Sequence, residues 1–304
     1  MREPALIQML ADGRRLHLHD GPIDLIVHAD GDTAFVDRAY RAAAVRFVTI
    51  LHELCGELPV LRARVGHEKP HGAVARSMFA AVTPYCQDRF ITPMAAVAGA
   101  VAEAVLAAMT QAAELERAYV NNGGDIAIHL APGRSYTVGM VERPEAVSLF
   151  GSVEIPAESA VRGIATSGWR GRSFSLGIAD AVTILAKTAA EADAAATMVA
   201  NEVDLAGHPA IRRVPACEIA PDSDLGDLPV TRAVGLLSSH DIARALDDGS
   251  RYAESLCAAR RIHSAALCLQ GDVRTVTITD RPGRSPLPHS HTLPQFPSRS
   301  LWHA

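Results

Sequence analysis

Residues 191–197 read Glu-Ala-Asp-Ala-Ala-Ala-Thr, inside an alanine-rich run that favours a helix over Ala189–Asn201. Asp193 and Thr197 are four residues apart, so a helix places their side-chain oxygens on one face. A carboxylate and a hydroxyl are hard oxygen donors of the kind Mg²⁺ accepts, with substrate phosphates completing its coordination. The same pair is also typical of an ordinary solvated helix face. Other parts of the chain have to decide between these interpretations.

Two further segments bear on that choice. Residues 121–126 read Asn-Asn-Gly-Gly-Asp-Ile, and residues 165–168 read Ala-Thr-Ser-Gly. A Gly-Gly turn at a strand end lets backbone approach a planar or phosphorylated ligand without a Cβ in the way. Alone, such a turn is an ordinary β-turn. The three segments in this order are hard to obtain by chance.

In that order the segments resemble the ApbE-type FAD:protein FMN transferases, which carry N-x-G-G-D-I, T-S-G and A-D-A-x-x-T motifs. The resemblance covers about residues 90–205. A fourth family element, a helix start of the A-K-G type, has a degraded counterpart in residues 94–103. The sequence of that segment is closest to the uncharacterised protein family branch of ApbE-like proteins. The resemblance implies an α/β (α+β) fold with mixed and antiparallel sheets packed with helices in a single large domain.

The same resemblance implies a site. In the family, FAD lies between these elements, Mg²⁺ clamps its pyrophosphate, and a hydroxyl of a target protein attacks the FMN phosphorus. By resemblance, the Mg²⁺ ligands here are Asp193, Thr197 and the backbone carbonyl of Val97. The residues expected to bind the flavin-like ligand are Asn121, Asn122, Gly123, Gly124, Asp125, Thr166, Ser167 and Gly168. A metal bridging two phosphates neutralises their charge and improves the leaving group.

The chain departs from the family between the second and third motifs, where the transferases carry H-x-x-D-P-x-T-G. Residues 173–183 are shorter and contain no histidine, no proline and no Thr-Gly pair. Asp180 stands where the family's aspartate stands and is the catalytic candidate, while Ala98 replaces the family's lysine. A general base must reach the proton it removes. The sequence therefore predicts that this chain is not an efficient general FMN transferase.

Two functions from different classes stay open. One is an enzyme related to Mg²⁺ and flavin, with FAD implied by the resemblance, that transfers FMN or acts on another phosphorylated or ring-bearing small molecule. The Asp193 and Thr197 pair favours this function. The other is a protein that holds a flavin, or another phosphorylated or ring-bearing small molecule, without catalysis, or a subunit of a larger complex. The missing histidine segment favours this second function. A protein partner and homo-oligomerisation are left open.

Bulk properties exclude some partners. The chain has 304 residues, 48% hydrophobic content, a net charge of −5 and a pI near 6.2, so no basic field invites nucleic acid. Its five cysteines form no C-x-x-C pattern, which indicates reduced thiols in a cytoplasm. The N-terminus has too short an apolar run for a signal peptide. The longest apolar stretch, residues 94–109, contains Glu103 and is shorter than a membrane span, so no membrane partner is expected.

Local patterns predict the remaining elements. Alternation on both sides of Asp20-Gly21 predicts a hairpin, and the residues after Asp32 predict a helix over 34–54. Residues 63–75 are expected to be a loop, with strands over 173–178 and 210–219. The domain is expected to span 1–281, followed by a proline-rich tail over 282–304 that is extended or disordered.

Histidines offer one more candidate site. His17 and His19 are two apart on a predicted strand and face the same way, which suits either a metal pair or an exposed strand face. His129, in the strand after the Gly-Gly turn, is nearer the expected site but has no partner in the sequence.

Overall fold

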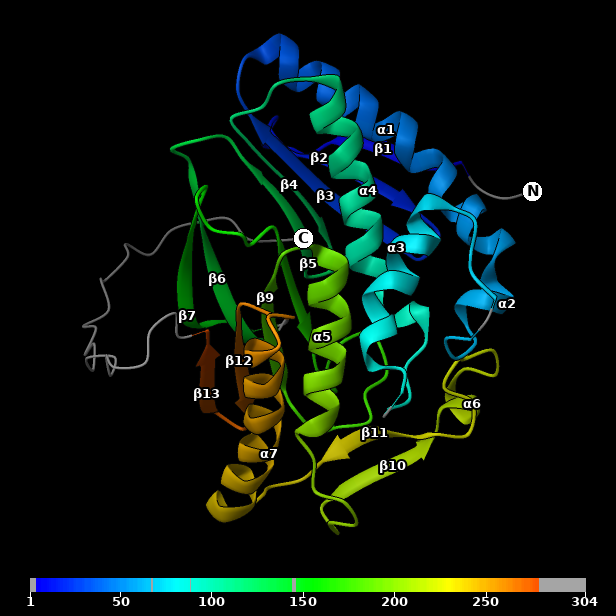
Figure 1. Cartoon of the computed structure of the whole chain (residues 1–304), viewed down its shortest axis with the longest axis vertical. Coiled ribbons are helices and arrows are strands. Elements are labelled where there is room, and N and C mark those ends of the chain that lie inside the picture. Colours follow the sequence, from blue (N-terminus) through cyan, green and yellow to red (C-terminus); the bar gives the residue numbers. More distant parts are fainter. Residues whose placement is uncertain (1–3, 67, 88, 144–145, 279–304) are drawn as a thin grey trace.

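A nine-stranded antiparallel sheet forms the centre of the protein (Figure 1). The computed structural model describes residues 4–66, 68–87, 89–143 and 146–278. The strands follow the order β1-β2-β3-β4-β5-β8-β9-β12-β13 across the sheet. Their bounds are β1 Leu6–Met9, β2 Leu16–Asp20, β3 Ile23–Asp30, β4 Arg117–Asn122, β5 Asp125–Leu130, β8 Gly163–Ser167, β9 Ala181–Ala186, β12 Ser264–Leu269 and β13 Asp272–Thr277.

Helices cover one face of this sheet (Figure 1). The long ones are α1 Thr33–Gly56, α3 Ala73–Val82, α4 Val97–Ala112, α5 Ala189–Glu202 and α7 Ser239–Ala258. Alternation in β3 explains why they pack there, because Leu25 and Val27 are fully buried towards the helices while their neighbours are partly exposed. One continuous hydrophobic core joins helices and sheet, and the chain is a mixed α/β protein in a single domain.

Helices α4 and α5 approach each other closely at their first turns. A Cβ on Gly99 would collide with the Ala189 carbonyl, and one on Gly163 in β8 would collide with Thr188. Small residues on both helices permit this approach, and the buried positions of α5 are mostly alanines. This close approach therefore brings the starts of both helices to the sheet.

The 3-10 turn η2, Pro93–Ala96, and α4 together are long and apolar enough, by length and composition, to cross a membrane. The sequence predicted a shorter apolar segment, residues 94–109, as too short for a membrane span. Half of that stretch is buried within the protein, against α1, α3 and α5. Core packing is thus sufficient to explain its composition.

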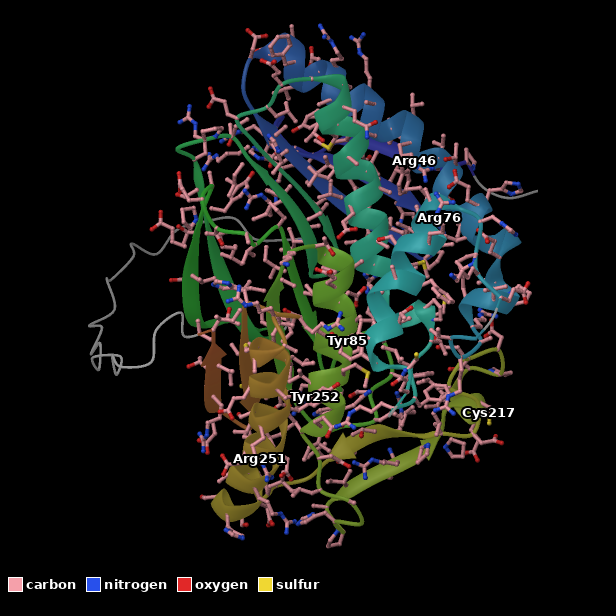
Figure 2. The ribbon with its side chains drawn as sticks, viewed as in Figure 1. Arg46, Arg76, Tyr85, Cys217, Arg251 and Tyr252 are labelled. Atoms are coloured by element: carbon pink, nitrogen blue, oxygen red, sulfur yellow. The ribbon has the colours of Figure 1, made fainter. Side chains whose placement is uncertain are left out.

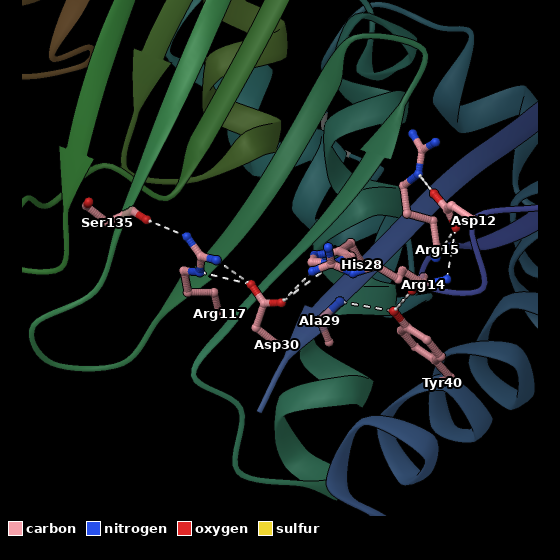
Figure 3. A network of polar contacts seen from close by, with 9 residues as sticks. All are labelled: Asp12, Arg14, Arg15, His28, Ala29, Asp30, Tyr40, Arg117 and Ser135. Atoms are coloured by element: carbon pink, nitrogen blue, oxygen red, sulfur yellow. Dashed lines mark hydrogen bonds and ion pairs between the residues drawn. The ribbon is translucent and has the colours of Figure 1, made fainter. Parts of the chain in front are cut away.

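The back face of the sheet has two unlike halves. Strands β6 Ser135–Arg143 and β7 Ala146–Pro156 form a hairpin whose Ile155 joins a small second core with Ile128, Ile164 and Leu185. Beside this core, β3 and β4 carry a polar network centred on Asp30 (Figure 3).

A smaller unit sits at the far end of α5 (Figure 1). It consists of the two-stranded sheet of β10 Ile211–Pro215 and β11 Pro229–Val234 with the short helix α6 Ala216–Ile219. The remaining short elements are α2 Leu58–Leu61 and the 3-10 turn η1 Thr83–Tyr85. The expected strand over 210–219 is therefore half strand and half helix.

Several sequence predictions are confirmed. The hairpin across Asp20-Gly21 is β2–β3, and the Asp32 side chain caps α1 by accepting a hydrogen bond from the Ala34 amide. Helix α5 begins at a Thr188 cap that accepts from the Glu191 amide. The expected loop over 63–75 is wrong in its last residues, because α3 already begins at Ala73.

The expected strand over 173–178 is wrong, and the strand lies later, at β9. The backbone of residues 176–178 bonds to the end of α5 instead: the Leu176 amide donates to Asn201 Oδ1 at 2.9 Å, and the Ile178 amide donates to the Val203 carbonyl at 2.8 Å. Gly177 permits this contact, since a Cβ there would collide with Ala200. Tertiary contacts thus override a local β pattern. The proline-rich tail over 282–304 lies outside the described residues.

Candidate functional site

The Gly-Gly turn joins β4 to β5 and lies beside the first turn of α4. Gly123 and Gly124 have φ of 65° and 111°, which glycine adopts without strain. Asn121 Oδ1 accepts a hydrogen bond from the Gly124 amide at 2.8 Å and closes the turn. The Asn122 amide group donates to the Ala98 carbonyl at 3.2 Å. The turn is therefore tied to the first turn of α4.

Helix α5 presents Asp193 and Thr197 on one face, as their spacing predicts. Both are partly exposed, while the alanines around them are buried. Asp193 Oδ2 accepts from the Gly99 amide at 3.0 Å, so the carboxylate caps the start of α4. In return, Glu103 Oε1 of α4 accepts from the Ala190 amide at 3.0 Å and caps α5. The two helices cap each other.

The Thr-Ser-Gly segment, residues 166–168, reaches the same place through Asp125. Its Oδ1 accepts from the Thr166 amide at 3.2 Å, and the Thr166 hydroxyl lies 2.9 Å from that of Thr183. Gly168, after the exposed Thr166 and half-buried Ser167, packs too tightly on the Asp180 backbone to carry a Cβ. The structure thus brings 121–125, 166–168 and the Asp193 face of α5 together.

Asp125 and Asp193 form an uncompensated acidic pair. Burial raises the pKa of Asp193 well above its usual range, and the charge of Asp125 raises it further. Burial also raises the pKa of Asp125 to about 7, opposed only in part by the Thr166 amide and the charge of Arg172. Both residues keep some exposure, yet their carboxyl groups lie in surroundings that disfavour the charged form. A bound cation would remove this penalty.

The donor set fits Mg²⁺. Two carboxylates and the Thr197 hydroxyl are hard oxygen donors, and that hydroxyl makes no hydrogen bond within the described part of the chain. Across the same residues there is no cluster of three or more histidine, cysteine or acidic side chains arranged for a metal. A site with few protein oxygens suits an ion that shares its coordination with phosphates. Val97 is the first residue of α4, and the role of its carbonyl stays a prediction.

Asp180 lies nearby but is occupied. Its oxygens accept hydrogen bonds from Arg170 Nε at 2.6 Å, from Trp169 Nε1 at 3.1 Å and from the Gln270 amide at 2.6 Å. The side chain is almost completely buried. Because three donors already engage its oxygens, this geometry favours a structural role for Asp180 over the catalytic one.

The histidines also have other roles. His129 lies at the far end of β5, where its Nε2 contacts the Leu115 carbonyl at 3.1 Å. His17 Nε2 lies 2.6 Å from Asp24 Oδ1, and His19 Nδ1 lies 4.0 Å from the same oxygen. These two histidines do form a pair on one strand face, but the pair is part of an ion-pair surface and not of a metal cluster.

Two hollows lie along α7, away from the Gly-Gly turn. One, of 520 Å³, is lined by charged residues that include Arg251, and the other, of 630 Å³, includes Tyr252. Figure 2 shows both labelled residues on α7. Neither hollow is lined by Asp125 or Asp193. The candidate site therefore rests on the convergence of the motifs and on their charge.

Sequence reasoning missed two features of the site. It gave Asp125 no electrostatic link to Asp193, although both aspartates stood in the motifs. It also passed over Arg172, because the arginines are dispersed along the chain. In the structure Arg172 is exposed and lies against Gly123. Its place directly after Thr-Ser-Gly was the available signal.

Comparisons with known proteins identify the family of this chain. The family model described as "AbpE bacteria" matches residues 7–275. A UPF0280 protein of Methanopyrus kandleri is 34% identical over 180 residues, which cover 59% of this chain and 69% of that protein. A UPF0280 protein of Methanosarcina acetivorans is 40% identical over 116 residues, covering 38% of this chain and 44% of that protein. A UPF0280 protein of Methanospirillum hungatei is 39% identical over 126 residues, covering 41% of this chain and 50% of that protein. The chain thus spans about half the length of these last two curated relatives.

Two solved structures are also similar. The apo flavinyl transferase ApbE of Pseudomonas stutzeri aligns with a TM-score of 0.38 at 13% identity, covering 90% of this chain and 95% of that one. The flavin transferase ApbE of Vibrio cholerae aligns with a TM-score of 0.37 at 12% identity, covering 90% and 97%.

Proposed function

This chain belongs to the family described as "AbpE bacteria", with relatives in the UPF0280 group, and on that premise we propose that it binds a flavin nucleotide together with Mg²⁺. The observation that carries the proposal is the meeting of three segments, distant in sequence, around the uncompensated Asp125 and Asp193 pair. We further propose that the protein works in the cytoplasm.

In this proposal Asp193 and Thr197 hold the cation, with the Asp125 carboxylate beside it and the Val97 carbonyl as a further ligand. When bound, Mg²⁺ supplies charge neutralisation to a pyrophosphate and polarises its phosphorus. The glycines of the turn allow the ligand to approach the backbone. The proposed ligand contacts are Asn121, Asn122, Gly123, Gly124, Asp125, Thr166, Ser167 and Gly168.

Covalent transfer to a target protein has less support. Asp180 is occupied by three donors, and His129 lies at the other end of β5. The raised pKa of Asp125 would suit a base, but a cation beside it restores an ordinary pKa. Because the matched segments contain no free base, this observation favours flavin binding without efficient FMN transfer. Efficient FMN transfer is the other candidate function.

The experiment has two parts. Mass spectrometry of ligand released from purified protein identifies the native occupant, and calorimetry with FAD, with and without Mg²⁺, tests the binding. Asp193→Asn should abolish the Mg²⁺-dependent part, while Glu191→Gln, a carboxylate on the same helix outside the site, should not. Failure of the wild type to bind FAD at millimolar Mg²⁺ would refute the flavin proposal.

A separate incubation with FAD, Mg²⁺ and a target domain bearing the family's acceptor motif distinguishes the two candidate functions. In-gel flavin fluorescence reports covalent transfer. We expect binding without fast labelling; rapid labelling that Asp193→Asn abolishes would establish the enzyme instead.

A further inference from the structure

Two arginines in the segment after β8 have opposite surroundings. Arg170 pairs with Asp180 at 2.6 Å, and its guanidinium stacks on the Trp169 ring at 4.4 Å from the centroid. Arg172, two residues later, is exposed and has no hydrogen bond or ion pair with any residue that the structure describes. A Gly171-to-Gly168 backbone hydrogen bond of 3.1 Å folds the segment between them. One guanidinium is thus committed to the fold and the other is available.

The available guanidinium lies at the candidate site. Its Nη2 packs against Gly123, so closely that a Cβ at this position would collide with it. Its charge acts on the Asp125 carboxylate without forming an ion pair. Arg172 therefore lies over the Gly-Gly turn, close enough for its charge to act on the Asp125 carboxylate.

The charge balance of the proposed site indicates a role for Arg172. A divalent cation held by Asp125 and Asp193 leaves the centre near neutral, with little net attraction for an anionic ligand. A guanidinium beside it supplies the missing positive charge and can donate two parallel hydrogen bonds to phosphate oxygens. Uncharged ring systems gain nothing from that interaction.

We propose that Arg172 is the specificity-determining residue that selects ligands bearing a phosphate over the same ligands without one. This inference rests on the proposed flavin site and goes beyond it, since it assigns the phosphate preference to one side chain in the segment where the chain departs from the transferases. Arg172 contacts the ligand phosphate, and Arg170 positions the segment that carries it.

The test compares FMN with riboflavin, which share a ring and differ by the phosphate. Dissociation constants are measured by flavin fluorescence with full-length protein and Mg²⁺. Arg172→Gln should weaken FMN binding about tenfold or more and leave riboflavin unchanged, because a hydrogen-bonded charge pair is lost only with FMN. Arg172→Lys should recover part of the loss. Arg170→Gln should lower the melting temperature but keep the FMN-to-riboflavin ratio.

The outcomes separate this inference from the proposed function. If wild type prefers FMN and Arg172→Gln keeps that preference, the flavin site stands and the role of Arg172 is refuted. If wild type binds no flavin, the flavin proposal fails, and the same variants are titrated with Mg²⁺ and inorganic pyrophosphate. Pyrophosphate binding that Arg172→Gln abolishes would still support the role of Arg172; absent or unchanged pyrophosphate binding would overturn it.

Discussion

The two faces of the sheet treat their aspartates in opposite ways. On the back face, Asp30 receives Arg117 through two nitrogens, at 3.0 and 2.6 Å, with Arg14 at 3.4 Å (Figure 3). On the helix-covered face, Asp125 and Asp193 accept hydrogen bonds from backbone amides, and their carboxylates repel one another. The back-face network satisfies its charge within the chain. The front pair does not, which is typical of sites completed by a ligand.

The residues around the back-face network also support the neutralised charge of Asp30. His28 stacks on Tyr119 at 5.5 Å between ring centroids, and Arg117 lies 5.3 Å from the centroid of the Tyr136 ring. Tyr40 bridges Arg14 and Ala29 through its hydroxyl. Burial lowers the pKa of His28, so it adds little charge of its own near neutrality.

The largest expected effect concerns binding. Asp193→Asn keeps an oxygen that can accept from the Gly99 amide but removes the charge that would hold Mg²⁺. We expect Mg²⁺-dependent flavin affinity to fall at least about 100-fold, since even outer partners of metal ligands cost 10–100-fold. Calorimetry measures it, with Asp30→Asn as the matched control on the other face. Equal losses in both variants would erase the contrast between the faces.

Stability should change in opposite directions at the two faces. In metal-free protein at pH 8, Asp125→Asn removes an uncompensated charge and should stabilise by about 1–2 kcal/mol, discounted for its partial exposure. Asp30→Asn leaves Arg117 without its carboxylate and should destabilise by about 1–2 kcal/mol. Urea denaturation gives both values. Two changes of the same sign would contradict the electrostatic difference.

The pH dependence sharpens the same point. Asp125 has a folded pKa of about 7, above its ordinary value of 3.8, so the native state holds a proton that the unfolded state has released between these values. Stability should therefore fall as pH rises through this window, by about 1–2 kcal/mol, and stay lower above it. The raised pKa of Asp193 acts in the same direction. Melting curves at pH 5.5 and 8 measure the fall, which the double variant Asp125→Asn, Asp193→Asn should largely abolish.

The smallest effect is that of the metal on the fold. At pH 8, Mg²⁺ about fivefold above its Kd should stabilise wild type by about 1 kcal/mol. Asp30→Asn should respond equally and Asp193→Asn not at all. Scanning fluorimetry with Mg²⁺ against Na⁺ at matched ionic strength detects the shift. A response that survives in Asp193→Asn would place the cation elsewhere.

The sequence predicted those parts of the molecule that local patterns determine. The Asp32 and Thr188 caps, the Asp20-Gly21 hairpin and the shared face of Asp193 and Thr197 all follow from spacing. The meeting of the three motifs followed from their order in a known family.

The rest depended on contacts between distant segments. Residues 176–178 lost their β pattern to the end of α5, and Asp180 found three donors that no local motif announces. The sequence also could not show which of Arg170 and Arg172 pairs with Asp180, because the two arginines differ only in their tertiary contacts. Ion pairs of this kind form only in the folded structure, so no periodic pattern in the sequence predicts them.

The mutual capping of α4 and α5 has a consequence for the order of folding. Its two hydrogen bonds join residues 94 and 87 positions apart, with β4 to β9 encoded between them. Closing such long loops is entropically costly, and contacts of this separation form late. Asp193 thus reaches its place beside Asp125 only when the central strands have already paired. A chain still emerging from the ribosome would lack the proposed cation site, so loading of the proposed cofactor should report on completed folding.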